Sequence, residues 1–199
     1  MATMRPTPSD SVLDIGVIDI DWRASNFLEA SYPWPDRITA AALTDMPAFR
    51  SAFPQISFVI ADGRDLPFHR HQFEIGFSNA VIEHVGSRAQ QRQFVAEMLR
   101  TCRRIFISTP NASFPVDPHT LLPFVHWLPL RWRRKVLGAL GDDWYGREEV
   151  LNPLSARDFA DLFPREAHVE LIHQRLLGMS YVVTAVAGLP ADPRSQTPA

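Results

Sequence analysis

Short apolar stretches alternate with amphipathic ones along this chain of 199 residues. Several of the apolar stretches have the length of buried strands and end at turn-forming or acidic residues. One amphipathic stretch runs from Arg88 to Cys102, just before the last of these apolar stretches. Its apolar residues have the spacing of one face of a helix. Strands that alternate with helices favour an α/β fold with a parallel sheet. The predicted strands are Ser11 to Val17, Arg37 to Leu43, Ile56 to Ala61, Phe73 to Asn79 and Ile105 to Ser108.

Two shorter helices are expected, and each of them ends at a proline. Asn26 to Tyr32 ends at a Pro-Trp-Pro breaker, and Met46 to Phe53 ends at Pro54. Asn26 stands three residues before Glu29, which is the spacing of a capping box. The sequence therefore predicts that Asn26 caps the first of these helices.

The second half of the chain does not continue this alternation of strands and helices. Pro110 to about Glu149 is rich in Pro, His, Trp and Arg, and it predicts an insertion rather than another strand and helix. Leu154 to Phe163 predicts a helix with Ser155 as its cap. Val169 to Leu177 and Ser180 to Ala187 predict two closing strands that form a hairpin.

These elements predict a Rossmann-like, doubly wound, mostly parallel sheet with a C-terminal antiparallel hairpin and an insertion after the fifth strand. Residues 11–188 would form a single domain, in which the insertion at about 110–149 lies over the ligand site. Residues 1–10 are polar and expected to be flexible. The Pro-rich residues 189–199 are expected to be disordered.

Carboxylates stand where the first strands end. Asp14, Asp45 and Asp62 close three predicted strands, and parallel strands end at one edge of a sheet, where ligands bind. Their coincidence favours a ligand-binding role over three separate strand terminators. Gly16 lets the chain turn sharply after the first strand and leaves room for a ligand.

The loop after Gly16 decides between ligands. A dinucleotide site needs several glycines and exposed N–H groups to hold phosphate. Here Asp19 and Asp21 follow instead, and carboxylates would repel a pyrophosphate. A cationic nucleoside without phosphate, such as S-adenosylmethionine (SAM), suits an acidic rim better. Asp19 and Asp21 themselves are interpreted as solvated loop charges.

Composition narrows the class of protein further. A formal net charge of −2 argues against a general nucleic-acid binder, which is usually basic. Cys102 is the single cysteine, so neither a disulfide framework nor a cysteine zinc site is expected. No apolar run has the length of a membrane span, and the first ten residues are unlike a signal peptide. The expectation is a cytoplasmic protein without an integral membrane segment.

Two further motifs carry a resemblance to a known family. Asp62 to Phe68 reads D-G-R-D-L-P-F after the third strand, and Val81 to Val85 reads V-I-E-H-V after the fourth. With Asp14-x-Gly16 and Asp45 in order before them, the chain resembles the class I SAM-dependent methyltransferases, in particular the small-molecule group of type 11. The resemblance covers roughly residues 11–110 and implies SAM as the cofactor.

The resemblance also implies roles for single residues. Asp14 and Gly16 would lie beside the methionine part of SAM, and Asp45 would accept hydrogen bonds from both ribose hydroxyls. Asp62 would accept one from the adenine amino group. The remaining implied cofactor contacts are the Gly63 N–H toward the adenine ring, Leu66 as an apolar wall for it, and Ser78 or Asn79 at the ammonium.

One position departs from the family pattern. The family usually has a second glycine two residues after the first, where this chain has Ile18. Glu83 and His84 follow the strand nearest the expected methyl group, and His84 is either a general base or a structural histidine. His126 is a candidate for the acceptor pocket. His119 and His126 are seven residues apart, but Pro123 between them argues against a shared helix face, so no metal site is expected.

Two functions from different classes remain open. The first is a SAM-dependent methyltransferase acting on an oxygen or nitrogen atom of a small-molecule, glycan or lipid-linked acceptor. The second, which Ile18 motivates, is a catalytically silent partner protein with the same fold. An NAD-dependent oxidoreductase is disfavoured by the acidic loop. A homodimer is compatible with the sequence, and no nucleic-acid partner is expected.

Overall fold

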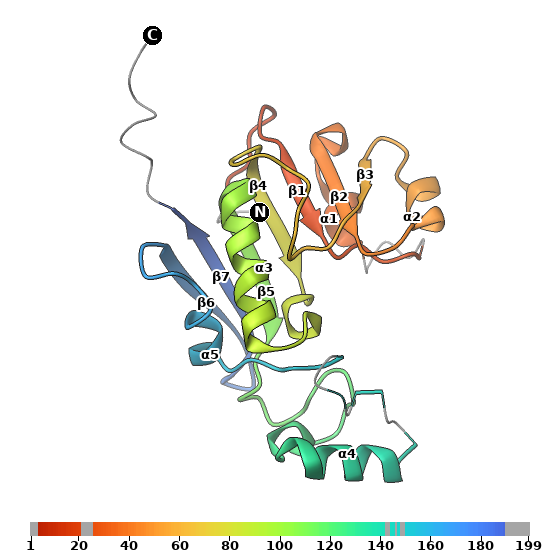
Figure 1. The fold of residues 1–199 in the computed structure, drawn as a ribbon, viewed down its shortest axis with the longest axis vertical. Coiled ribbons are helices and arrows are strands. Elements are labelled where there is room, and N and C mark those ends of the chain that lie inside the picture. Colours follow the sequence, from red (N-terminus) through yellow and green to blue (C-terminus); the bar gives the residue numbers. More distant parts are fainter. Residues whose placement is uncertain (1–3, 21–25, 142–143, 146, 148–149, 190–199) are drawn as a thin grey trace.

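The computed structural model describes residues 4–20, 26–141, 144–145, 147 and 150–189. Within these residues one sheet of seven strands has the order β3-β2-β1-β4-β5-β7-β6 (Figure 1). The predicted Rossmann-like architecture is confirmed. The strands are β1 (Val12–Ile15), β2 (Ile38–Ala42), β3 (Ser57–Ile60), β4 (Phe73–Asn79), β5 (Cys102–Pro110), β6 (His168–Leu176) and β7 (Met179–Gly188).

Only β7 runs against the other strands of the sheet. β1 lies between β2 and β4 and is parallel to both, and β3 and β5 extend this parallel part. β7 is antiparallel to β5, and β6 pairs with β7 as the predicted hairpin. The C-terminal ends of β1 to β5 therefore meet along one edge, which is called the carboxyl edge below.

Helices of different length cover the two faces of the sheet. The longest is α3, which lies across β4 and β5 (Figure 1). The helices are α1 (Phe27–Ser31), α2 (Pro47–Ala52), α3 (Arg88–Thr101), α4 (Leu130–Ala139) and α5 (Ala156–Ala160), with 3₁₀ turns η1 (Pro35–Arg37), η2 (Ile82–His84) and η3 (Val125–Trp127).

The face under α3 and α5 holds the larger core. The apolar residues of α3 that the periodicity predicts to face inward are buried, Phe94 and Met98 among them. Ser87 and Gln90 form a capping box at the start of α3, and Ser155 with Asp158 forms another at α5. Both reciprocal caps satisfy N–H groups that the first helical turn leaves without partners.

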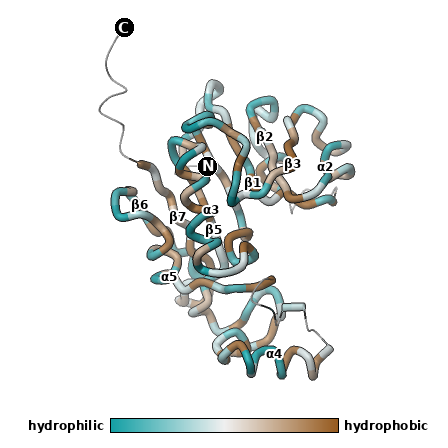
Figure 2. Tube along the Cα trace, in the orientation of Figure 1, coloured by the Kyte–Doolittle hydropathy of each residue, from teal (hydrophilic) through white to brown (hydrophobic). Residues whose placement is uncertain are grey.

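The opposite face is covered only in part. α1 and α2 pack Leu28 and Phe49 onto β1 and β2, but the same face of β4, β5 and β7 is left as an open apolar groove. Phe77 and Phe106 stack there with ring centroids 5.3 Å apart. The colouring of Figure 2 shows the alternation of hydrophobic and hydrophilic residues along these elements.

The predicted insertion lies beyond the carboxyl edge. Figure 1 shows α4 away from the sheet, connected to β5 and α5 by long loops. Asn111 pairs with Leu154 where the insertion leaves and rejoins the sheet. Arg133 of α4 is buried and donates to the Leu151 carbonyl oxygen at 3.0 Å. These contacts tie the insertion to the chain that follows it.

Some local predictions differ from the structure. Asn26 stands at the N-cap of α1, but its side chain makes no cap hydrogen bond there, so the predicted capping box with Glu29 is wrong. Of the segment expected to be flexible, Met4 is buried and Asp10 forms an ion pair with Arg104 at 2.9 Å. Asp21 and the expected disordered tail, apart from residue 189, fall outside the described residues.

None of the helices in the described part of the chain is both long and apolar enough to cross a bilayer.

Candidate functional site

The loop after β1 requires a glycine at position 16. Gly16 has φ +105°, a conformation that side-chain-bearing residues rarely adopt. A Cβ atom at this position would lie 2.2 Å from Cγ2 of Val81. The sharp turn that the sequence predicts therefore places the backbone directly against the loop that follows β4.

A buried carboxyl pair lies at the base of this turn. Asp14 is inside β1, opposite Ala40 of β2 and Phe77 of β4, and it is 5% exposed. Burial, and then the hydrogen bond and negative charge of Glu29, raise the pKa of Asp14 well above its usual value. Protonated Asp14 can donate to Glu29, whose Oε1 atom is buried without another hydrogen-bond partner among the described residues.

The departure from the glycine pattern has a structural counterpart. Asn26 accepts a hydrogen bond from the N–H of Ile18 and donates to the carbonyl oxygens of Ile18 and Ile20. The side chain of Ile18 points to solvent with 43% exposure. Asn26 thus holds the acidic loop in the place where the family has its second glycine.

Two aspartates near the start of α2, one from the loop after β2 and one from the loop after β1, have different roles. Asp45 is half-exposed, accepts from the Met46 N–H and forms an ion pair with Arg50 at 3.1 Å. Asp19, which the sequence leaves as a solvated charge, accepts from the N–H groups of Ala48 and Phe49 at 2.7 and 3.1 Å. Asp19 therefore caps α2 from a distant loop, and the interpretation of Asp19 as a free loop charge is wrong.

The loop after β3 holds Asp62 against a cation. Arg64 approaches both carboxylate oxygens of Asp62, the shortest contact being 2.6 Å. Hydrogen bonds from Arg64 lower the pKa of Asp62. Gly63 packs so tightly that a Cβ there would lie 2.5 Å from the Phe94 ring. Leu66 is buried in the core and its N–H donates to Glu97.

The end of β4 contributes a polar pair. The Ser78 hydroxyl is buried and donates to the Ile15 carbonyl oxygen at 3.1 Å. Asn79 Oδ1 accepts a hydrogen bond from the Ser108 hydroxyl of β5. Asn79 and Asp14 line the same small cavity at the carboxyl edge. Ser78 therefore supports the β1 loop, whereas Asn79 reaches the cavity.

Glu83 is a buried carboxyl group in η2. Its Oε2 atom accepts a hydrogen bond from the Thr109 hydroxyl at 2.9 Å, but Oε1 has no hydrogen-bond partner among the described residues. Burial raises the pKa of Glu83 to about 7. A carboxyl group that costs this much to ionise is typical of a functional site.

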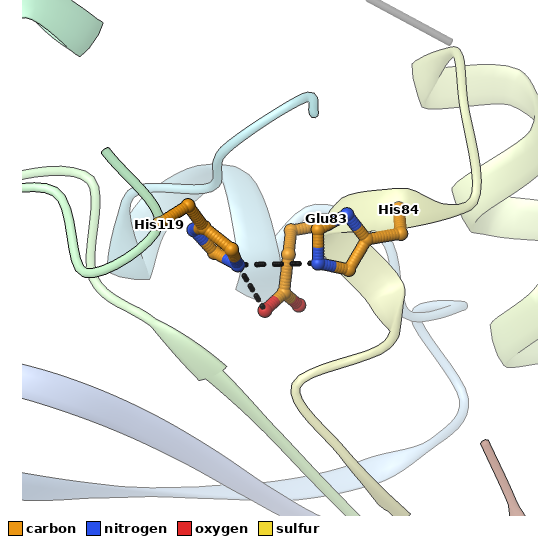
Figure 3. Close-up of side chains that lie close together, drawn as sticks. All are labelled: Glu83, His84 and His119. Carbon is orange, nitrogen blue, oxygen red and sulfur yellow. Dashed lines mark hydrogen bonds and ion pairs between the residues drawn. The ribbon is translucent and has the colours of Figure 1, made fainter. Parts of the chain in front are cut away.

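Two histidines meet beside Glu83, as Figure 3 shows. The ring nitrogens Nε2 of His84 and His119 are 3.1 Å apart, and His119 Nε2 is 3.8 Å from Glu83 Oε1. His84 Nδ1 lies 2.6 Å from the Val150 carbonyl oxygen, and His119 Nδ1 lies 3.1 Å from Asp117 Oδ1. The sequence did not predict His119 or Asp117 here, because 35 residues separate the two histidines.

The charges of this cluster are unequal. Burial lowers the pKa of His84. Burial also acts to lower the pKa of His119, but the hydrogen bond and charge of Asp117 outweigh it and raise this pKa overall. Burial opposes ionisation of Asp117, yet its hydrogen bonds from His119 and Thr120 lower its pKa to about 2. Asp117 is therefore the permanent negative charge beside the two rings.

His126 lies near the cluster but is bonded elsewhere. Its Nε2 atom is 3.0 and 2.9 Å from the carbonyl oxygens of Ala112 and Phe114. The Nδ1 atom is buried and has no partner among the described residues. His126 shares a small cavity with Glu83 and His119, while its hydrogen bonds connect segments within the insertion.

Comparisons with known proteins bear on the fold. Residues 35–105 match a family model described as a methyltransferase domain. A candidate Zn-dependent alcohol dehydrogenase from Rhodobacter sphaeroides is similar in structure, with a TM-score of 0.66 and 13% identity over 94% of this chain and 87% of that one. A comparison with curated proteins gives no match.

Two similar structures are methyltransferases by name. A SAM-dependent methyltransferase from Methanosarcina mazei has a TM-score of 0.54 and 12% identity over 94% of this chain and 96% of that one. A candidate methyltransferase from Haloferax volcanii, solved in complex with the activator Trm112, has a TM-score of 0.59 and 13% identity over 96% of this chain and 86% of that one.

The strand order separates this fold from one class of α/β protein. Dinucleotide-binding dehydrogenases of the doubly wound class have the strand order 3-2-1-4-5-6 with parallel strands, whereas here an antiparallel β7 lies between β5 and β6. By this topology and the match of residues 35–105 to a methyltransferase domain, the chain has a methyltransferase-like fold.

Proposed function

We propose that this protein transfers a methyl group from SAM to an oxygen or nitrogen atom of a small-molecule, glycan or lipid-linked acceptor. The observation that carries the proposal is the row of carboxylates along the carboxyl edge. Asp14 belongs to β1, Asp45 follows β2 and Asp62 follows β3, and these three strands are neighbours in the sheet. Such a row favours a cationic nucleoside without phosphate.

The residues at the carboxyl edge fit SAM from one end to the other. Among the described residues, Glu29 Oε1 has no donor other than Asp14, and the ammonium group of the cofactor would supply one. The half-exposed Asp45 carboxylate can accept from both ribose hydroxyls. Asp62 would accept from the adenine amino group, with the Gly63 N–H donating to the ring.

Further residues complete the proposed cofactor site. Gly16 has no side chain, so the ligand could approach the backbone of this turn closely. Asn79 would hold the ammonium end from the β4 side, and Ser78 would fix the β1 loop by its bond to Ile15. Leu66 is the exception, because its burial in the core makes it a support for the adenine loop rather than an exposed wall.

When bound, SAM supplies a methyl group on a sulfonium, a leaving group that needs no activation. The protein then has to hold the acceptor in line and exclude water. The insertion lies beyond the carboxyl edge, where it can cover an acceptor that sits next to β4 and β5 (Figure 1). Trp127, Trp132 and Leu128 leave this insertion partly apolar on its outside, which suits a lipid-linked acceptor.

A hydroxyl or amine acceptor must lose a proton, and His84 is the proposed base. Its lowered pKa keeps the ring neutral near pH 7, and the bond to Val150 directs Nε2 into the cluster. Glu83 would position the cluster from beneath, and His126 would hold the loops around the acceptor. A carboxylate acceptor would need no base.

Methyl transfer can be tested without knowing the acceptor. The protein is incubated with SAM carrying a heavy-isotope methyl group and with pooled small-molecule, glycan and lipid extracts, and the products are followed by mass spectrometry. We expect a labelled product in one pool and its loss in His84→Ala, while His173→Ala, an exposed histidine on β6, keeps the activity. A labelled product of equal yield in His84→Ala would contradict the role of His84.

A catalytically silent partner protein is the second candidate. Ile18 in place of the second glycine and the open apolar groove over β4, β5 and β7 favour it, because such a groove is a place where another protein can bind. This function predicts no binding of SAM or S-adenosylhomocysteine by calorimetry. It also predicts that a second protein co-purifies with the chain. A stable monomer that consumes SAM would reject it.

A further inference from the structure

Three potential metal ligands converge beyond β4 and β5. One atom from each of Glu83, His84 and His119 lies within 4.8 Å of the others (Figure 3). Glu83 and His84 are neighbours in η2, whereas His119 comes from the insertion. The fold brings the insertion back to the sheet edge at this point, so the cluster is a product of tertiary structure.

The hydrogen bonds of the two histidines fix where their lone pairs point. His84 Nδ1 faces the Val150 carbonyl oxygen at 2.6 Å, and a carbonyl only accepts, so this nitrogen carries a proton. His119 Nδ1 donates to the Asp117 carboxylate in the same way. In both neutral rings the lone pair is then on Nε2, and the two Nε2 atoms face each other at 3.1 Å. Facing lone pairs at this distance repel unless a proton on one ring or a metal ion lies between them.

Glu83 supplies a negative oxygen at the same place. The side chain is 1% exposed, and Oε1 is a buried oxygen without a hydrogen-bond partner among the described residues. Oε1 points toward His119 Nε2 at 3.8 Å, too far for a hydrogen bond. A buried carboxylate oxygen and two ring nitrogens thus face one another, and a cation at their centre would serve all three.

Each of the three proposed ligands also has a hydrogen-bond partner on the atom that faces away from the cluster centre. Asp117 orients His119, the Val150 carbonyl orients His84, and the Thr109 hydroxyl holds the other oxygen of Glu83. Carboxylate and carbonyl partners on the far nitrogen are typical of histidines that bind metals. His84 is exposed to solvent, which gives an ion a way in.

We infer that Glu83, His84 and His119 bind one divalent transition-metal ion of the Zn²⁺ type through Oε1 and the two Nε2 atoms. Imidazole suits Zn²⁺, whereas Mg²⁺ and Ca²⁺ take oxygen ligands. Nitrogens bound at about 2.0–2.1 Å in a tetrahedral site lie roughly 3.3 Å apart, close to the 3.1 Å separation of the two Nε2 atoms. Glu83 Oε1 has to move inward, because its 3.8 Å distance to His119 Nε2 exceeds this spacing.

The ion would do two things in this position. It would fasten the insertion, which carries His119, to η2 at the end of β4. Three protein ligands leave one tetrahedral position for water or for an oxygen or nitrogen atom of an acceptor. An ion on His84 Nε2 occupies the lone pair that a general base would use, so the base role proposed for His84 applies to the metal-free protein only. Zn²⁺ binding does not itself require methyl transfer and is tested separately.

The test measures metal binding directly, by isothermal calorimetry with ZnCl₂ on the full chain after removal of metals with a chelator. We expect one site per chain and a higher melting temperature on addition of Zn²⁺. Co²⁺ should give the intense visible absorption of a tetrahedral site, without the sulfur charge-transfer band of a cysteine ligand. Cys102 is buried, so a sulfur band would overturn the assignment.

Variants of single residues measure how much each residue of the cluster contributes to Zn²⁺ binding. Asp117→Asn should weaken Zn²⁺ binding by about 10–100-fold, as expected for a second-layer partner. His119→Ala should weaken it more, and His173→Ala, which removes an exposed histidine on β6, should leave it unchanged. If His119→Ala fails to fold by circular dichroism, His84→Gln at the exposed ligand takes its place. Absence of Zn²⁺ binding in the wild type, or equal binding in the ligand variant, overturns the inference.

Discussion

Along the carboxyl edge, the loops after β1, β2 and β3 present carboxylates that their own strands supply, whereas beyond β4 and β5 the polar side chains come from two distant segments. Asp14, Asp45 and Asp62 each lie within or just after a strand. Glu83, His84 and His119 meet only because the insertion returns to η2. We call the first set the carboxylate row and the second the histidine cluster.

The difference teaches how each region obtains its geometry. The carboxylate row follows from strand order alone, since neighbouring parallel strands bring their ends together. The histidine cluster depends on how a loop of the insertion packs. Changes in the row should therefore act on cofactor binding, and changes in the cluster on metal binding and on the chemistry of the acceptor.

The largest expected effect concerns the turn that shapes the carboxylate row. Gly16→Ala would force a side chain into φ +105° and into contact with Val81. We expect a loss of about 2–5 kcal/mol in the free energy of unfolding, from the backbone conformation and the overpacking together. Chemical denaturation measures it.

The matched control for this variant is Gly178→Ala. Gly178 also has a positive φ, +81°, but nothing lies within 4 Å of the Cβ position. The loss should be about 1–2 kcal/mol, the backbone part alone. Equal losses in the two variants would show that the space around Gly16 is unimportant.

The next effect tests the middle of the row. Asp45→Asn should weaken binding of S-adenosylhomocysteine by roughly 10–100-fold, because hydrogen bonds to a charged group contribute about 1.5–3 kcal/mol. Asp36→Asn is the control, since Asp36 is a more exposed aspartate that pairs with Arg37. Calorimetry on both variants gives the ratio, and similar affinities would remove Asp45 from the site.

The pH dependence of stability tests the base of the row. The folded-state pKa of Asp14 lies above its unfolded value, so this carboxyl group stabilises the fold below the unfolded pKa of about 3.9. The contribution is lost as the pH rises through the folded pKa. The free energy of unfolding should therefore fall less in Asp14→Asn than in the wild type as the pH rises from 5 to 8. Urea unfolding at several pH values measures both proteins.

Binding of a cofactor should reverse this effect on Asp14. An ammonium beside Asp14 and Glu29 favours the ionised carboxyl, so the proton leaves when the cofactor binds. The binding heat of S-adenosylhomocysteine should then vary with the ionisation enthalpy of the buffer. A heat that is the same in phosphate and Tris would argue against an ammonium at Asp14.

The smallest effect separates the two regions. His119→Ala should leave the affinity for S-adenosylhomocysteine within about 2-fold of the wild type, because sites without shared partners act almost independently. The same variant is expected to lose Zn²⁺. A large loss of cofactor affinity would show that the histidine cluster and the carboxylate row are one site.

The sequence contained most of the fold because the relevant signals are local. The apolar residues of α3 repeat at helical spacing, and Ser155 precedes its helix as a cap. Short apolar runs likewise predicted the parallel strands and the hairpin. Strand order then brought Asp14, Asp45 and Asp62 to one edge, as predicted.

What the sequence did not contain depends on distant contacts. Asp19 caps α2 across 29 residues, and Asn26 holds the acidic loop instead of its own helix. His119 reaches His84 across the insertion, and a spacing argument that paired His119 with His126 looked for the wrong partner. Side chains that hydrogen-bond across the fold leave no periodic trace in the sequence.

The most direct measurement is a crystal structure of the protein with S-adenosylhomocysteine. The account predicts the ribose hydroxyls on Asp45, the adenine next to Asp62 and the amino group beside Asp14 and Glu29. Density for the ligand in the apolar groove under Phe77 and Phe106, or no density at saturating concentration, would contradict it.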